Sequence, residues 1–255
     1  MILIDTHAHL YSEEFKTDIA NIMQRARIAG VHKIYLPGID SHSIDDMLAL
    51  EQEYPGECIA MMGLHPCYVK ENYRDELAIV EQWLEKRPFV AVGEIGLDFY
   101  WDTTFVKEQY DAFKTQMQWA LDRSLPIVIH TRSAMNETIE TVKPFADQGL
   151  RGIFHCFSGD AAAARKVVNM GFYLGIGGVL TYKNSGLGEA LENIPAEYLV
   201  LETDSPYLAP VPYRGKTNES GYLTYIISKL AEIKKLPETE LAAITTANAQ
   251  KIFGS

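Results

Sequence analysis

Short apolar runs alternate with longer amphipathic segments along almost the whole chain. The apolar runs predict β-strands, and most are followed by a segment whose apolar residues recur at helical spacing. Eight such runs are present, with these bounds: Ile2–Asp5, Lys33–Leu36, Cys58–Gly63, Phe89–Glu94, Pro126–His130, Gly152–His155, Phe172–Gly175 and Tyr198–Glu202.

The segments between the runs predict helices and loops that cross from one strand to the next. Eight strands with such crossovers are typical of an α/β protein with a (β/α)8 TIM barrel. A doubly wound open sheet is the alternative, but no glycine-rich phosphate turn follows the first strand. The expected helices include two at the C-terminus, after the last strand: Ile19–Ala29, Ser43–Glu53, Asp75–Glu85, Thr104–Arg123, Met135–Phe145, Ala161–Met170, Gly186–Asn193, Ser220–Ile233 and Glu238–Phe253.

Length and composition fit this prediction. The 255 residues contain no linker or charge block, so we expect one barrel domain over residues 1–255. The chain shows no signal-peptide pattern and no apolar run long enough to span a membrane. The three cysteines, an odd number without regular spacing, are typical of free thiols. We therefore expect a cytoplasmic protein, as a monomer or weak oligomer.

The net charge of -11 changes the range of expected partners. A protein without a basic face does not bind duplex nucleic acid broadly by electrostatics. A phosphate substrate remains compatible with this charge, because bound divalent cations reverse the local sign inside a cleft.

Polar residues with metal-binding chemistry follow the predicted strands. His7 and His9 lie one residue apart and so share a strand face. Active sites of barrels lie at the C-terminal ends of the strands, where these side chains would meet. We predict that a metal centre is formed by His7, His9, Glu94, His130, His155 and Asp204.

Six ligands are too many for one tetrahedral ion that keeps a position open. They suit two ions about 3.5–4 Å apart that share a bridging carboxylate. Glu94 stands midway in strand order and is the expected bridge. Our assignment places His7, His9, Glu94 and Asp204 on one ion, and Glu94, His130 and His155 on the other.

Several motifs in fixed order resemble the TatD-type metal-dependent deoxyribonucleases, within the amidohydrolase superfamily. The likeness extends from residue 4 to Ala249, and these segments carry it: Asp5–His9, Gly63–Pro66, Gly93–Asp98, His155–Gly159, Glu202–Pro210 and Arg214–Glu219. The resemblance implies a hydrolase of DNA phosphodiesters, commonly a 3′-end exonuclease that prefers single strands. We expect Mg or Mn as the working ions, with Zn, Fe, Co and Ni as alternatives.

Catalytic and substrate-binding roles follow as hypotheses. Asp204 is a candidate general base or else serves only as a metal ligand, and Glu94 acts as the bridge between the ions. His65 would contact the substrate phosphate or protonate the leaving oxygen, or else have a structural role beside Pro66. A loop after the last strand is expected to contact phosphate through Arg214, Lys216 and Asn218, the alternative being a solvated basic loop.

Two further features have open interpretations. The aromatic run Phe99–Trp101 would either stack on an unpaired base or pack at the barrel rim. Glu202 lies two residues before Asp204 and is expected to contact an imidazole rather than a metal.

Two other functions remain open. The same metal centre would serve a carbonyl-directed amidohydrolase or a D-aminoacyl-tRNA deacylase, because metals polarise carbonyl and phosphoryl oxygens alike. A metal-stabilised scaffold without turnover is the third interpretation, and the full ligand set argues against it.

Overall fold

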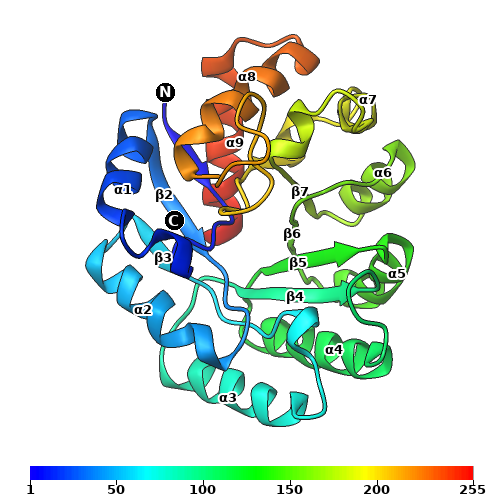
Figure 1. Cartoon of the computed structure of the whole chain (residues 1–255). Coiled ribbons are helices and arrows are strands. Elements are labelled where there is room, and N and C mark those ends of the chain that lie inside the picture. The colour runs from blue at the N-terminus through cyan, green and yellow to red at the C-terminus, as the bar shows by residue number, and fades with distance from the viewer. Residues whose placement is uncertain (255) are drawn as a thin grey trace.

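Eight parallel strands follow one another around a barrel in the computed structural model, which describes residues 1–254. Figure 1 shows helices α1–α8 around the outside in chain order. The strands are β1 (Leu3–Asp5), β2 (Val31–Leu36), β3 (Cys58–Ala60), β4 (Val92–Asp98), β5 (Ile127–Arg132), β6 (Gly152–Phe154), β7 (Tyr173–Ile176) and β8 (Leu199–Leu201). The predicted TIM barrel is confirmed.

The helices lie close to their predicted positions. In the described residues they are α1 (Ile19–Ile28), α2 (Ile44–Glu53), α3 (Tyr73–Lys86), α4 (Val106–Asp122), α5 (Met135–Ala146), α6 (Ala161–Asn169), α7 (Leu187–Leu191), α8 (Leu223–Lys234) and α9 (Glu238–Phe253). Short 3₁₀ turns lie between them: η1 (Glu13–Phe15), η2 (Ser41–Ser43), η3 (Pro66–Tyr68), η4 (Gly178–Thr181), η5 (Ala196–Tyr198) and η6 (Ser220–Tyr222). No described helix is long and apolar enough to cross a membrane.

Backbone hydrogen bonds at two seams close the ring. The ladders form a three-stranded piece, β1–β3, and a five-stranded piece, β4–β8. At one seam Thr6 N donates to Leu201 O over 3.0 Å. At the other, Gly93 N donates to Met62 O, also over 3.0 Å. These bonds join β1 to β8 and β3 to β4, so the ligand-bearing strand ends face a common mouth.

The opposite mouth is filled by apolar side chains and covered by α9. The ring of Phe253, at the end of α9, stacks on Tyr35 of β2 with 3.8 Å between centroids. This inner apolar layer comprises Ile4, Tyr35, Met61, Ala91, Val128, Ile153, Tyr173 and Val200 from the strands, and Ala249, Ile252 and Phe253 from α9. Because this layer packs the barrel interior at the amino-terminal end, the polar residues gather at the carboxyl-terminal end.

The prediction that the fourth strand spans Phe89–Glu94 is wrong. Strand β4 begins at Val92 and continues past Glu94 to Asp98, pairing with β5 as far as Arg132. The ladder skips one residue between Gly93 and Ile95, so Glu94 forms a bulge. The apolar residues Ile95 and Leu97 continue the strand beyond Glu94, and pairing with β5 extends it to Asp98.

The bulge sets which way Glu94 faces. Val92, Ile95 and Leu97 all pack into the core shared with the helices, although strict alternation would put Val92 and Ile95 on opposite faces. The extra residue shifts the alternation by one and turns Glu94 to the inside of the barrel. Bulges often re-aim a side chain beside an active site in this way.

Candidate metal centre

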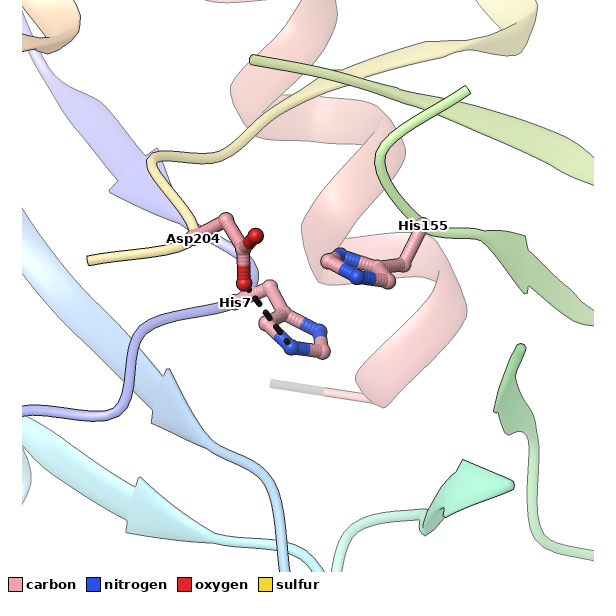
Figure 2. Close-up of side chains that lie close together, drawn as sticks. All are labelled: His7, His155 and Asp204. Atoms are coloured by element: carbon pink, nitrogen blue, oxygen red, sulfur yellow. Dashed lines mark ion pairs between the residues drawn. The ribbon is translucent and has the colours of Figure 1, made fainter. Parts of the chain in front are cut away.

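The structure brings all six predicted ligands together at the carboxyl-terminal mouth of the barrel. Figure 2 shows three of them, His7, His155 and Asp204, which come from the ends of β1, β6 and β8 and point toward one another. The imidazoles of His7 and His155 stack with 3.6 Å between ring centroids. A pocket of about 720 Å³ opens above, lined by His9, His65, Glu94, His130, His155 and Asp204 among others.

Glu94 lies at the centre of the cluster, and its two oxygens face different groups of imidazoles. Its Oε2 lies 3.1 Å from His7 Nε2 and 3.5 Å from His9 Nε2. Its Oε1 lies 2.9 Å from His130 Nδ1 and 3.4 Å from His155 Nε2. A carboxylate with a different set of nitrogen donors at each oxygen has the arrangement that a bridge between two ions requires.

Asp204 faces the same group as Glu94 Oε2. Its Oδ1 lies 3.8 Å from His7 Nε2 and 3.6 Å from His9 Nε2. The Asp204 backbone has a φ of 57°, in the left-handed region, and its N–H donates to His7 O over 2.9 Å. Strained backbone of this kind costs roughly 1–3 kcal/mol and gathers at functional sites.

In three imidazoles, an acceptor lies beside the ring nitrogen that points away from Glu94, and this contact orients the ring. His130 Nε2 lies 2.9 Å from Asp98 Oδ2, and His155 Nδ1 lies 3.0 Å from Glu202 Oε1. His9 Nδ1 lies 2.9 Å from the Tyr11 hydroxyl, whose own proton goes to a backbone carbonyl. The outer nitrogens of His9 and His130 are hydrogen-bonded in this way, and that of His155 lies beside a carboxylate, so the inner nitrogen of each ring is left to bind a metal ion, as in metal-ligating histidines.

His65 is oriented in the opposite sense. Its Nδ1 accepts a hydrogen bond from the backbone N–H of Cys67 over 3.0 Å. In a neutral imidazole the proton is then on Nε2, which lies 3.2 Å from Glu94 Oε1. His65 therefore presents an N–H to the cluster, whereas the inner nitrogens of His9, His130 and His155 are placed to bind a metal ion.

The electrostatics of the cluster suit divalent cations. Burial alone would raise the pKa of Glu94, but His65, His7 and His155 hold it well below its usual range. Burial alone would lower the pKa of His155, but Glu202, Glu94 and Asp204 raise it to about 10. Buried carboxylates so concentrated are normally compensated by metal ions or paired cations.

The spacing of the donor atoms also fits metal binding. At a metal–ligand distance of about 2.1 Å, neighbouring ligand atoms lie roughly 3.0–3.4 Å apart in octahedral or tetrahedral geometry. His7 Nε2 and His9 Nε2 are separated by 3.3 Å and lie 3.1 and 3.5 Å from Glu94 Oε2. The residues present therefore fit metal ions both in donor chemistry and in separation.

The sequence analysis missed Asp98 as a functional residue. Its Oδ2 contacts His130, and its Oδ1 accepts hydrogen bonds from the backbone N–H groups of Tyr100 and Trp101. Asp98 lies four residues after Glu94 and shares its strand face. Extending the predicted strand to Asp98 would have revealed it, whereas the expected contact of Glu202 with an imidazole is confirmed.

The loop predicted to contact phosphate lies outside the pocket lining. Arg214 and Lys216 are exposed, and the Arg214 guanidinium rests over the Tyr182 ring, 4.4 Å from its centroid. Asn218 is buried, and its amide donates to the carbonyls of Thr203 and Tyr207 over 2.7 Å each. Both amide protons of Asn218 are thereby used to hold the loop.

Arg132 was also missed. Of the described residues that line the pocket, it is the only arginine or lysine. It lies two residues after His130 on the same strand, the spacing that marked His7 and His9 as sharing a face. Period-two alternation beyond His130 would have found it.

Comparisons with known proteins identify the family. The family model described as TatD related DNase matches residues 4–254. An uncharacterized metal-dependent hydrolase, YabD of Bacillus subtilis, is 37% identical over 99% of both chains. The protein named 3′-5′ ssDNA/RNA exonuclease TatD of Erwinia tasmaniensis is 31% identical over 98% of this chain and 99% of its own.

A solved structure shows the same fold. The TatD homologue YjjV of Escherichia coli K12 superposes with a TM-score of 0.93 at 30% identity, covering 99% of this chain and 98% of its own. The match in family model, sequence and structure extends over nearly the whole chain. The chain belongs to the family of TatD related DNases, which are metal-dependent hydrolases.

Proposed function

We propose that this protein hydrolyses phosphodiester bonds of DNA and removes nucleotides from the 3′ ends of single strands, with two divalent ions, Mg or Mn. The observation that carries the proposal is the position of Glu94, whose Oε2 faces His7 and His9 while its Oε1 faces His130 and His155. Two-metal sites with a bridging carboxylate suit the in-line displacement of a phosphodiester oxygen.

In this proposal His7, His9, Glu94 and Asp204 would hold one ion, and Glu94, His130 and His155 would hold the other. When bound, such ions would supply an activated water at neutral pH and would offset charge on phosphoryl oxygens.

Two side chains then handle protons. The Asp204 carboxylate lines the pocket and accepts the proton of the attacking water as the new oxygen–phosphorus bond forms. The Nε2–H of His65 points into the same space and donates a hydrogen bond to the departing oxygen as its bond to phosphorus breaks. Arg214 and Lys216 remain our prediction for phosphate contacts further along the strand.

The relative named 3′-5′ ssDNA/RNA exonuclease supports the substrate and the polarity. The net charge of -11 supports binding confined to the pocket, because broad electrostatic contact with a duplex requires a basic face. A strand end enters such a pocket more readily than the middle of a duplex.

The test is digestion of 3′-labelled and 5′-labelled single-stranded oligonucleotides by chelator-stripped protein, with Mg or Mn added back. We expect metal-dependent release of the 3′ label first. The Asp204→Asn variant should be inactive while keeping its circular dichroism spectrum. If protein shown to bind two ions cleaves neither DNA nor RNA, the proposal is wrong, and D-aminoacyl esters become the next substrates to test.

A further inference from the structure

Large aromatic and apolar side chains are exposed around the mouth of the metal pocket. Trp101, which is 67% exposed, lines the pocket together with Tyr68, Tyr207 and Leu208. An aromatic ring that serves only as core packing is normally buried. Exposure of this degree beside a catalytic cluster points to a ligand that covers the ring.

Arg132 lies against the same aromatic segment. Its guanidinium carbon is 3.9 Å from the centroid of the Tyr100 ring and 5.1 Å from that of Trp101. Stacking on Tyr100 restricts the long side chain, while its exposed N–H groups remain available to an anion. A restrained guanidinium binds a phosphate bidentately with less loss of conformational entropy than a free one.

Asp98 connects this segment to the metal cluster. One of its oxygens accepts hydrogen bonds from Tyr100 N and Trp101 N at 2.9 and 3.0 Å, and the other contacts His130. The Phe99 N–H also donates to Arg132 O over 2.9 Å. The backbone at Trp101 and at Arg132 is therefore held at a fixed position relative to the cluster.

We propose that Trp101 and Arg132 form the subsite for the terminal nucleotide, in which Trp101 stacks on the unpaired base and Arg132 binds a phosphate oxygen. This inference rests on the proposed function and deepens it. Stacking accepts any base and requires that the base be unpaired, so the subsite selects single-stranded ends without reading sequence. Arg132 is the only lysine or arginine among the described residues that line the pocket, and it lies beside the Trp101 ring. Binding of a phosphate at this position accounts for that placement.

The first test compares two trinucleotides, one normal and one whose 3′-terminal base is replaced by hydrogen on a tetrahydrofuran ring. Wild-type protein should prefer the normal substrate in kcat/KM by on the order of tenfold, since stacking strengthens binding of the base. Trp101→Ala should remove this preference by slowing only the normal substrate. Arg132→Gln should slow both substrates and weaken the dependence of KM on salt.

Controls are available away from the pocket lining. Arg151 is an exposed arginine just before β6, and Ile28 is an exposed apolar side chain at the last position of α1. Arg151→Gln and Ile28→Ala should leave both substrates unaffected. Equal cleavage of the two substrates by wild-type protein, or a preference that survives Trp101→Ala, would overturn the subsite while leaving the proposed function in place.

A binding measurement separates the subsite from turnover. In stopped-flow mixing of metal-loaded protein with the normal trinucleotide, Trp101 fluorescence should be quenched in the first milliseconds. Trp101→Phe should abolish the quenching, because Trp83 and Trp119 do not line the pocket. Quenching without cleavage would support the subsite and refute the proposed function, whereas an absence of saturable quenching would refute the subsite.

Discussion

The carboxylate of Glu202 lies 3.0 Å from Nδ1 of His155, on the opposite side of the ring from Glu94. The same Glu202 oxygen accepts a hydrogen bond from the backbone N–H of Cys156 over 2.5 Å. Its neighbour on β7 is Gly175, where a Cβ atom would lie only 2.1 Å from Glu202 Oε2. Glu202 is thus fixed by its surroundings, and it fixes the orientation of a candidate metal ligand.

Replacing Glu202 by glutamine should weaken metal binding roughly 10–100-fold, because the buried partner of His155 loses its charge. Competition with a chromophoric chelator measures the affinity, and the circular dichroism spectrum should stay unchanged. Glu189→Gln, an exposed change on α7, is the control. Unaltered affinity in the Glu202→Gln protein would show that this contact has no part in metal binding.

His65 and His155 should respond differently to substitution by glutamine. Because His65 presents an N–H to the cluster, His65→Gln should retain two ions per chain while kcat falls about 10²–10⁴-fold. His155 has its inner nitrogen 3.4 Å from Glu94 Oε1, where our assignment makes it a metal ligand, so His155→Gln should lose one ion. Mass spectrometry of metal content after gel filtration distinguishes the two, and one ion per chain in His65→Gln would make His65 a ligand.

Gly96→Ala should destabilise the protein by several kcal/mol, on the order of 3–5. Gly96 has a φ of 151°, and a Cβ atom there would lie 1.9 Å from His130 O. Gly171, with a φ of 81° and no atom within 4 Å of an added Cβ, is the matched control. Gly171→Ala should cost only about 1–2 kcal/mol in backbone strain. Urea denaturation compares the two, and equal losses would contradict the close approach of β4 and β5.

Arg214 should contribute only to the binding of longer strands, because it is exposed and does not line the pocket. We expect Arg214→Ala to raise KM for a decanucleotide roughly two- to fivefold, because one exposed charge contact contributes only that much to binding. KM for a dinucleotide should not change. If Arg214→Ala leaves KM unchanged for the decanucleotide as well as for the dinucleotide, Arg214 is not a phosphate-binding residue.

The sequence by itself determined the barrel and which residues are candidate metal ligands. Alternating apolar runs and amphipathic segments predicted eight strands, and parallel strands in a barrel end at one mouth. His7, His9, His130, His155 and Asp204 follow such strands, so their convergence required no further information. Chain order alone therefore placed these residues together.

Tertiary structure decided how the side chains are oriented and which ones reach the pocket. The β4 bulge that turns Glu94 inward depends on pairing with β5, which an apolar pattern does not encode. The proton position on His65 depends on the Cys67 N–H, a contact set by the turn that follows. Arg132 lines the pocket and Arg214 does not, although Arg132 ends strand β5 and Arg214 follows strand β8. Sequence spacing determines on which face of a strand a side chain lies. Bulges, hydrogen bonds and loop packing determine the final position and orientation of that side chain.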